Sequence, residues 1–414
     1  MAAEGPDVCV IGAGAIGLAT AYFLHERGAK VTVLEADHVA SGSSGLSVGI
    51  IETQYMTPLD IALRVHAMDF FDMLVNDHGL GITRNGYLRL ARNDKSIADA
   101  EQSVATQHSL GVEDATVLDR AAIEKLIPDM NCEDVAGGLF GPSDGFIDGH
   151  LYANLLADLL MAAGVELKVR QKVVGIDSDG ERRTVRTEAG LEVPCDYVVL
   201  AAGAWGAKLG AELGVSMPIE PQRHQATVID LGRSPGYVMP CVMDYIPHSG
   251  EIGLYFRHER DGHLIGGLHS EEISEDSLVD PDNYGRSVDH DFMEGVAQKL
   301  TVRLPGFPDA SLGGGWTGIY PVSPDGVPQA GPSPEDPRVM IAGGAGGSGI
   351  QLSPSLGRVV AEWVLDGSVS AFEGAEQLLP GRPSLQSACA CLRPVRGCSI
   401  YYISPATRTR SGVR

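Results

Sequence analysis

The stretch VCVIGAGAIG, residues 8–17, decides the fold of this chain. A β-branched run ends directly in the glycine-rich sequence GAGAIG, and apolar residues then recur at helical spacing over residues 18–24. A second β-branched run, residues 30–34, ends in Glu35. This order predicts a strand, a glycine turn, a helix and a second strand closed by an acid, all within one βαβ unit.

Each part of this unit has a physical role in binding a dinucleotide. Gly12 permits the tight turn, Gly14 lets the backbone approach a pyrophosphate, and Gly17 lets the helix pack closely on the strand. The helix N-terminus offers free N–H groups and the positive end of its dipole to phosphates. Glu35 follows at the distance where a carboxylate accepts hydrogen bonds from a ribose diol. Glycines alone also mark ordinary turns, but their register with strand, helix and acid predicts an adenine dinucleotide site.

Composition narrows the function classes. A chain of 414 residues is long enough for two or three domains. Its net charge of −23 disfavours nucleic acid as a partner, because phosphates need a basic surface. The seven cysteines are scattered and odd in number, which favours a reducing compartment over a disulfide framework. We find no signal peptide and no apolar run of the ~18–20 residues that a membrane span needs, so we expect a cytoplasmic protein.

Periodicity and turn residues place the remaining elements. Helices are expected over residues 59–78, 96–108, 119–126, 151–164, 289–304 and 357–365. Strands are expected over residues 86–90, on both sides of a turn at 177–182, and over 191–193, 222–231, 253–268 and 339–342. Residues 196–205 are expected to form a buried strand that runs into a small-residue turn. Residues 386–414 hold three cysteines and several arginines without apolar periodicity, so we expect a disordered tail or a segment foreign to the main fold. A metal site there is disfavoured because the tail has no histidine.

Three segments together resemble one family. They are GAGAIG with Glu35, DYVVLAAGAW at residues 196–205, and WTGIYPVSPDGVPQAGP with VMIAGGAGGSGIQLSPSLGRVVAE between residues 316 and 362. This set resembles the FAD-dependent D-amino-acid-oxidase superfamily and is similar to its sarcosine oxidase beta-subunit and dimethylglycine dehydrogenase-like branch. GLSVGII at residues 45–51 and the segment 286–307 are also similar to FAD-dependent oxidoreductase domain-containing proteins. The resemblance covers roughly residues 6–380.

The resemblance implies a fold and a division into domains. The fold class is α/β, a glutathione-reductase-type Rossmann FAD-binding domain, with an α+β substrate domain built on an antiparallel sheet. The FAD-binding domain would be discontinuous, comprising residues 1–85, 145–215 and 320–385. Residues 86–144 and 216–319 would form the substrate or cap domain. A second glycine-rich turn, residues 343–350, would aim helix N–H groups at the flavin and stabilise the anionic reduced ring.

The resemblance also implies the cofactor and its contacts. We expect noncovalent FAD, because WTGIYP contains no cysteine and SSGLSV no histidine where relatives attach the flavin. The cofactor-binding residues are then expected to be Gly12, Ala13, Gly14, Ala15, Ile16, Gly17, Glu35, Ala36, Ser41, Ser43, Ser44, Leu46, Ser47, Val173, Ala202, Gly203, Trp205, Gly346, Gly347, Ser348, Gly349, Ile350 and Gln351.

The substrate end departs from the family pattern. Family members that act on small amino acids hold the substrate carboxylate with arginines, where this chain has Glu52, Tyr320 and Gly347. Glu52 is then either a solvated loop residue or the partner of a cationic amine. The residues expected to line the catalytic pocket are Tyr255, Arg257, His269 and Tyr320, with Arg223 a further candidate. Alternatively, each arginine is a solvated residue at a strand edge, and each His or Tyr only packs within the sheet.

These features predict an FAD-dependent enzyme that removes a hydride from the carbon next to a nitrogen in a secondary or tertiary amine or amino acid. Residues 262–269 contain no lysine, which oxidase relatives use near the flavin. A quinone or a partner protein is therefore at least as good a candidate electron acceptor as oxygen. Two alternatives stay open. One is a 2-hydroxy-acid dehydrogenase, since GFID at residues 145–148 is similar to that branch. The other is a flavin-bearing assembly or interaction protein with little turnover.

Overall fold

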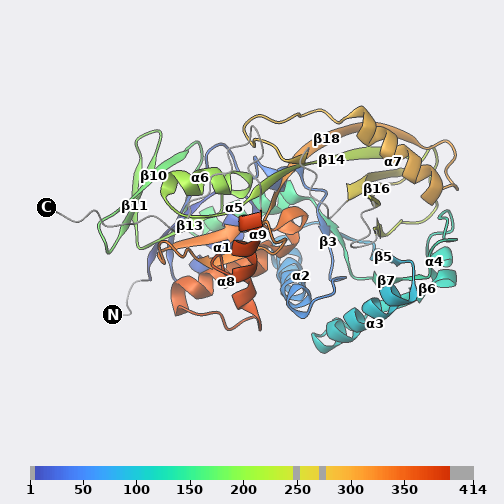
Figure 1. Cartoon of the computed structure of the whole chain (residues 1–414), viewed down its shortest axis with the longest axis horizontal. Helices are drawn as coiled ribbons and strands as arrows, with labels where there is room; N and C mark the ends of the chain where they lie inside the picture. The colour runs from blue at the N-terminus through green and yellow to red at the C-terminus, as the bar shows by residue number, and fades with distance from the viewer. Residues whose placement is uncertain (1–4, 246–251, 270–276, 392–414) are drawn as a thin grey trace.

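The structure, a computed structural model, describes residues 5–245, 252–269 and 277–391 (Figure 1). A six-stranded sheet and an eight-stranded sheet dominate this part of the chain. In the described segments, no helix is long and apolar enough to cross a membrane. None of the described cysteines forms a disulfide, and four of them are buried.

The six-stranded sheet has the order β19-β20-β13-β1-β2-β9. Its strands are parallel except for the antiparallel pair β19 and β20. Their bounds are β1 Asp7–Ile11, β2 Lys30–Leu34, β9 Glu166–Lys168, β13 Tyr197–Leu200, β19 Gln329–Pro332 and β20 Val339–Gly343. The central strands are almost fully buried and β-branched, as expected for a sheet covered on both faces.

Helices bring the two ends of the sequence together. The helices of this region are α1 Ala15–Glu26, α2 Pro58–His78, α5 Gly149–Ala162 and α8 Gly349–Asp366. Helices α1 and α8 lie side by side (Figure 1) and pack through Gly357 of α8, where a Cβ would come within 2.7 Å of the Ala19 carbonyl carbon. Helix α2 is capped at its N-terminus by Thr57, whose side chain accepts a hydrogen bond from the Asp60 N–H, and at its C-terminus by Gly79 in the left-handed conformation.

The eight-stranded sheet has the order β18-β14-β17-β16-β15-β5-β7-β6. Its strands are β5 Tyr87–Ala91, β6 Thr116–Asp119, β7 Gly137–Gly141, β14 Glu220–Asp230, β15 Cys241–Asp244, β16 Gly253–Arg260, β17 His263–His269 and β18 Ser311–Val322. Helices α3 Asp94–Ser109, α4 Arg120–Leu126 and α7 His290–Arg303 pack against it. Neighbouring strands pair antiparallel, apart from β5 with β15. The predicted domain boundary at residues 319–320 falls inside β18.

Smaller elements complete the described structure. One three-stranded sheet comprises β10 Val173–Ser178, β11 Arg183–Thr187 and β12 Glu192–Cys195, and another comprises β3 Ile50–Ile51, β4 Ile82–Arg84 and β8 Gly145–Ile147. The other helices are α6 Gly206–Leu213 and α9 Pro383–Cys391, with short 3₁₀ turns at Ser43–Leu46, Gly203–Trp205, Gly346–Ser348 and Ala375–Leu378.

Three predictions about elements need correction. Residues 253–268 form a hairpin rather than one strand, because Gly262 turns the chain with a φ of +70°. Helix α8 begins at Gly349, eight residues before the predicted start. Residues 386–391, predicted to belong to the atypical tail, belong to helix α9, and the rest of the predicted tail lies outside the described residues.

Candidate functional site

A long cavity of about 520 Å³ runs along the carboxyl edge of the six-stranded sheet and under the eight-stranded sheet. At one end it is lined by the start of β10 and by the turn after β2, and at the other by β14, β16 and β18. The predicted cofactor residues that line it are Gly12, Gly14, Ala15, Ile16, Glu35, Ala36, Ser41, Ser43, Ser44, Leu46, Ser47, Val173, Ala202, Gly203, Trp205, Gly346, Gly347, Gly349 and Ile350. Four predicted residues are not among the lining: Ala13, Gly17, Ser348 and Gln351.

The first glycine turn has the geometry its sequence predicts. Gly12 has a φ of +111°, a value that favours glycine. A Cβ on Gly17 would lie 2.0 Å from the Gly12 carbonyl oxygen, so only glycine lets α1 approach β1 this closely. Gly17 therefore shapes the turn rather than the cavity wall. Helix α1 begins right after Gly14, with its N-terminus at the cavity.

Glu35 lies in the cavity wall at the end of β2. One carboxylate oxygen accepts a hydrogen bond from the Ala13 N–H at 2.8 Å, and the other accepts one from the Asp37 N–H at 2.8 Å. These bonds fix the carboxylate between the glycine turn and the segment that follows β2. A carboxylate held here can still accept further hydrogen bonds, since each oxygen has two lone pairs.

The small-residue loop at residues 40–47 joins the two sheets. The Ser44 hydroxyl oxygen accepts a hydrogen bond from the Ala15 N–H at 3.0 Å, in the first turn of α1. Ser43 donates a hydrogen bond to the Ile319 carbonyl of β18 at 2.6 Å. The indole of Trp316, also on β18, donates one to the Leu46 carbonyl at 2.8 Å. The loop thus holds the eight-stranded sheet over the glycine turn.

The second glycine-rich turn lies at the other end of the cavity. It connects β20 to α8 through residues 343–349, and α8 begins there with Gly349 and Ile350 in the cavity wall. Because β1, β13 and β20 are parallel, α1 and α8 start at the same sheet edge. Two helix N-termini, each with unsatisfied N–H groups and positive dipole ends, therefore face one cavity.

Aromatic side chains form the wall opposite α8. Tyr255, Trp316 and Tyr320 line the cavity together with His224. Burial, followed by the proximity of His269, lowers the pKa of His224 to about 4. Burial raises the pKa of Tyr320 to about 12. Both side chains are therefore neutral at pH 7.

The candidate arginines are engaged elsewhere. Arg257 donates to the Val48 carbonyl at 2.6 Å and to Glu259 at 2.6 Å, and its guanidinium lies 4.1 Å from the Phe146 ring centroid. Arg223 is bound by Asp289 and by the carbonyls of residues 285 and 287. Neither arginine is among the residues that line the cavity.

His269 is likewise not among the lining residues; it packs edge-on against Tyr245 with ring centroids 4.9 Å apart.

Glu52 is buried and ion-paired, so the prediction of a solvated loop residue is wrong. Its side chain lies 3.1 Å from Arg64, and only 5 % of Glu52 and 2 % of Arg64 are exposed. The second carboxylate oxygen accepts a hydrogen bond from the Gln54 N–H at 2.7 Å. Gln351 also belongs to this buried group. Its side-chain oxygen accepts a hydrogen bond from the Glu52 N–H, and its side-chain nitrogen donates one to the Arg64 carbonyl.

Sequence reasoning missed His224 and chose its neighbour Arg223. The two residues are adjacent on β14, so strand alternation sends them to opposite faces and only one can reach the cavity. Six charged residues that line the cavity were also missed: Asp37, Lys172, Lys208, Glu212, Asp282 and Arg286. Asp282 accepts a hydrogen bond from the Trp205 indole at 2.8 Å and is ion-paired with Lys208.

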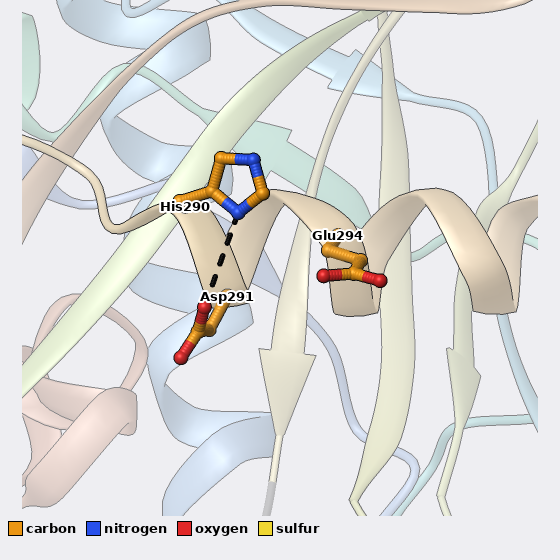
Figure 2. A group of neighbouring side chains, drawn as sticks. All are labelled: His290, Asp291 and Glu294. Carbon is orange, nitrogen blue, oxygen red and sulfur yellow. Dashed lines mark ion pairs between the residues drawn. The ribbon is translucent and has the colours of Figure 1, made fainter.

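A separate group of side chains lies on the surface of α7. Figure 2 shows His290, Asp291 and Glu294 on this helix, with an ion pair of 3.9 Å between His290 and Asp291. All three side chains are exposed, and such groups are common on surfaces without a metal. We assign no ion to it.

Comparison with known proteins identifies the family. Residues 7–363 match the model of the DAO family, described as FAD dependent oxidoreductase. This chain belongs to that family. The enzyme is an FAD-dependent oxidoreductase, and the cavity fits the cofactor because two glycine turns and two helix N-termini line one elongated space.

Individual relatives agree with this assignment. The oxidoreductase is 30 % identical over 412 residues to FAD-dependent oxidoreductase domain-containing protein 1 of Bos taurus, covering 88 % of this chain and 82 % of the relative. It is 28 % identical over 374 residues to mitochondrial sarcosine dehydrogenase of Mus musculus, covering 87 % of this chain but 40 % of that protein. The L-proline dehydrogenase of P. horikoshii has the same fold, with a TM-score of 0.80, 24 % identity, and coverage of 94 % of this chain and 100 % of that one.

Proposed function

We propose that this oxidoreductase oxidises the carbon–nitrogen bond of a secondary or tertiary amine or amino acid of the sarcosine, dimethylglycine or proline type. Bound FAD supplies the hydride acceptor. The observation that carries the proposal is the neutral aromatic wall of Tyr255, Tyr320 and His224, which faces the N-terminus of α8. Such a wall excludes water and leaves the field of the helix end unscreened.

The wall also bears on the protonation state in which the amine reacts. A protonated amine cannot lose a hydride until its nitrogen lone pair is free, so a base is needed if the substrate arrives as an ammonium ion. His224 is neutral at pH 7. Its Nε2 lies 3.5 Å from the side-chain oxygen of Gln222. Because so low a pKa makes His224 a weak base, the substrate nitrogen is proposed to react as the free amine, having lost its proton to solvent before hydride transfer.

The adenine end of the site is proposed from the residues already described. Glu35 would accept hydrogen bonds from the ribose of FAD, the two glycine turns would hold its phosphates and flavin, and Val173 would contact its adenine. FAD is held without a covalent bond. We further propose that the reduced enzyme passes electrons to a quinone or protein acceptor. Strand β17, where oxidase relatives are expected to carry a lysine near the flavin, contains no lysine.

Anaerobic reduction of the holoenzyme tests the proposal. Sarcosine, dimethylglycine and proline are each mixed with the protein, and the visible absorbance of the flavin is followed. We expect at least one of them to bleach the flavin, and the rate of bleaching to fall as the pH is lowered and more of the substrate nitrogen is protonated. Bleaching by 2-hydroxyglutarate alone would establish the hydroxy-acid alternative. If no amine or hydroxy acid bleaches the flavin, the assembly or interaction role is favoured.

A further inference from the structure

The serine that precedes helix α8 does not cap it. Ser348 occupies the N-cap position, where a serine hydroxyl ordinarily accepts a hydrogen bond from an N–H of the first turn, but within the described structure its side chain accepts none. At the start of α2, by contrast, the Thr57 side chain accepts a hydrogen bond from the Asp60 N–H. Ser348 thus leaves the first turn of α8 without a side-chain cap, where Gly349 and Ile350 line the cavity.

A buried arginine of α2 holds the Ser348 hydroxyl instead. Arg64 donates a hydrogen bond to the Ser348 Oγ at 3.0 Å, and the Tyr55 hydroxyl lies 3.4 Å from the same oxygen. The guanidinium carbon of Arg64 lies 3.4 Å from the centroid of the Tyr55 ring. Gln351, in the first turn of α8, donates a hydrogen bond to the Arg64 carbonyl at 3.3 Å. Arg64 therefore contacts the start of α8 with both its side chain and its backbone.

The same guanidinium links α8 to a buried carboxylate. Its Nη2 binds Ser348, whereas its Nη1 donates to Glu52 at 3.1 Å. The second oxygen of Glu52 is engaged by the Gln54 N–H. The cation of this ion pair is thus in contact with the helix start, and the anion lies on the other side of the cation. Because both side chains are buried, water screens their charges only weakly.

The second glycine turn separates this ion pair from the cavity. Ser348 stands between Gly347 and Gly349, which both line the cavity. The Arg64 guanidinium is therefore one backbone residue behind the cavity wall, at the helix end expected to face the flavin. A flavin that accepts a hydride becomes negatively charged, so positive charge nearby stabilises its reduced form relative to its neutral oxidised form.

We propose that Arg64 is a positioning residue that raises the reduction potential of the bound flavin. It holds the Ser348 hydroxyl away from the first N–H groups of α8, and it adds its own positive charge behind the helix N-terminus. Glu52 opposes this effect, so the two members of the ion pair act on the flavin with opposite sign. This inference requires bound FAD but no particular substrate, and it is therefore independent of the amine proposed above.

The midpoint potential of the holoenzyme tests this role. The flavin is reduced slowly, without substrate and without oxygen, beside a dye of known potential, and the absorbance of both is followed. We expect Arg64→Met to lower the midpoint potential by about 30 mV or more, which is a tenfold change in the equilibrium constant of a two-electron couple. Arg64→Lys keeps the charge and should lie close to the parent protein. Glu52→Gln should raise the potential, because it removes the negative member of the pair.

The opposite signs separate an effect of charge from one of structure. Arg64→Met and Glu52→Gln break the same ion pair, so a merely structural role would shift the potential in the same direction in both. The double variant Arg64→Met with Glu52→Gln has no unpaired charge and serves where a single variant does not retain FAD. Its potential should fall below that of the parent, because the charge in contact with α8 is lost. Single variants that shift in the same direction or not at all, or a double variant at or above the parent potential, overturn the proposal.

Arg303→Met is the matched control. Arg303 is as buried as Arg64 and is ion-paired with Asp244 at 2.8 Å, but it lies on α7, which packs against the eight-stranded sheet. We expect this variant to lower Tm without shifting the midpoint potential. A shift equal to that of Arg64→Met would also overturn the proposal, because it would show that loss of any buried arginine changes the flavin.

Discussion

The imidazole of His224 stacks on the phenol of Tyr320, with ring centroids 3.7 Å apart and 18° between the ring planes. The two residues come from the paired strands β14 and β18, in which Gln222 lies opposite Tyr320. Stacking removes water from one face of the imidazole, in keeping with the burial that lowers its pKa to about 4. The contact thus joins the geometry of the cavity wall to the protonation state of its histidine.

The first prediction concerns acid stability. The pKa of His224 in the folded protein is about 4, below its ordinary value of 6.5. As pH falls from about 6.5 to about 4, His224 is therefore protonated in the unfolded chain but remains neutral in the folded protein. Stability is therefore lost over this window. His224→Phe keeps an aromatic ring but removes the titration, and should flatten the fall of Tm with pH. The exposed His290→Gln variant should leave it unchanged. An identical slope in His224→Phe and the parent protein would contradict the low pKa.

The second prediction concerns the buried pair of Glu52 and Arg64. Glu52→Gln leaves the Arg64 cation without a charged partner and should cost ~3–5 kcal/mol of unfolding free energy, measured by urea denaturation. Glu259→Gln removes the exposed partner of Arg257 and should cost at most ~1 kcal/mol. Adding Arg64→Met to Glu52→Gln should recover part of the loss, because the unpaired charge is gone. Near-equal losses for Glu52→Gln and Glu259→Gln would show that the buried pair is not needed for stability.

The third prediction concerns the first glycine turn. Gly17→Ala forces a Cβ against the Gly12 carbonyl oxygen, so α1 must move away from β1. The purified variant should contain much less flavin than the parent protein and have a lower Tm. Gly81→Ala is the matched control, since Gly81 has ordinary φ and no atom within 4 Å of the added Cβ. Full flavin occupancy in Gly17→Ala would show that the turn does not need this close approach.

The fourth prediction concerns Glu220 at the start of β14. Both carboxylate oxygens are buried and have no hydrogen-bond partner among the described residues, and burial raises the pKa of this group above 4.5. The folded protein therefore holds a proton that the unfolded chain releases, and stability falls as pH rises above 4.5. Glu220→Gln should raise Tm near pH 8 by a few degrees, as expected for relief of one buried, uncompensated group. The gain should vanish near pH 4.5. A gain independent of pH would point to packing instead.

The regular elements could be predicted because their periods are strong. The helices α2, α3, α4 and α7 lie within a few residues of the predicted ranges, and Asp119 caps α4 as expected. The hairpin of β16 and β17 was missed although its turn carries the Asp-Gly signal at residues 261–262. The early start of α8 could not be predicted, because residues 349–355 include Gly349 and Pro354, two residues of low helix propensity. Burial of Ile350 to Leu356 between α1 and α2 overrides that low propensity.

The two ends of the site were not equally predictable. The dinucleotide end depends on local motifs, so most residues named from sequence line the cavity. The substrate end is assembled from β14, β16 and β18, which are separate segments of the sequence. The pairing register between strands from separate segments cannot be derived from a single sequence. The sequence therefore could not decide whether Arg223 or His224 faces the cavity.

The position of β13 between β1 and β20 has a consequence for biosynthesis. The first strand emerges from the ribosome long before the last strand of its sheet is made. The face of α1 that packs against Gly357 stays uncovered until α8 has been synthesised. Until about residue 366 has left the exit tunnel, the nascent chain exposes apolar surface on α1. The cofactor-binding half of this enzyme is therefore completed only after α8 has been translated, and chains that stop before α8 should be substrates for chaperones and proteases.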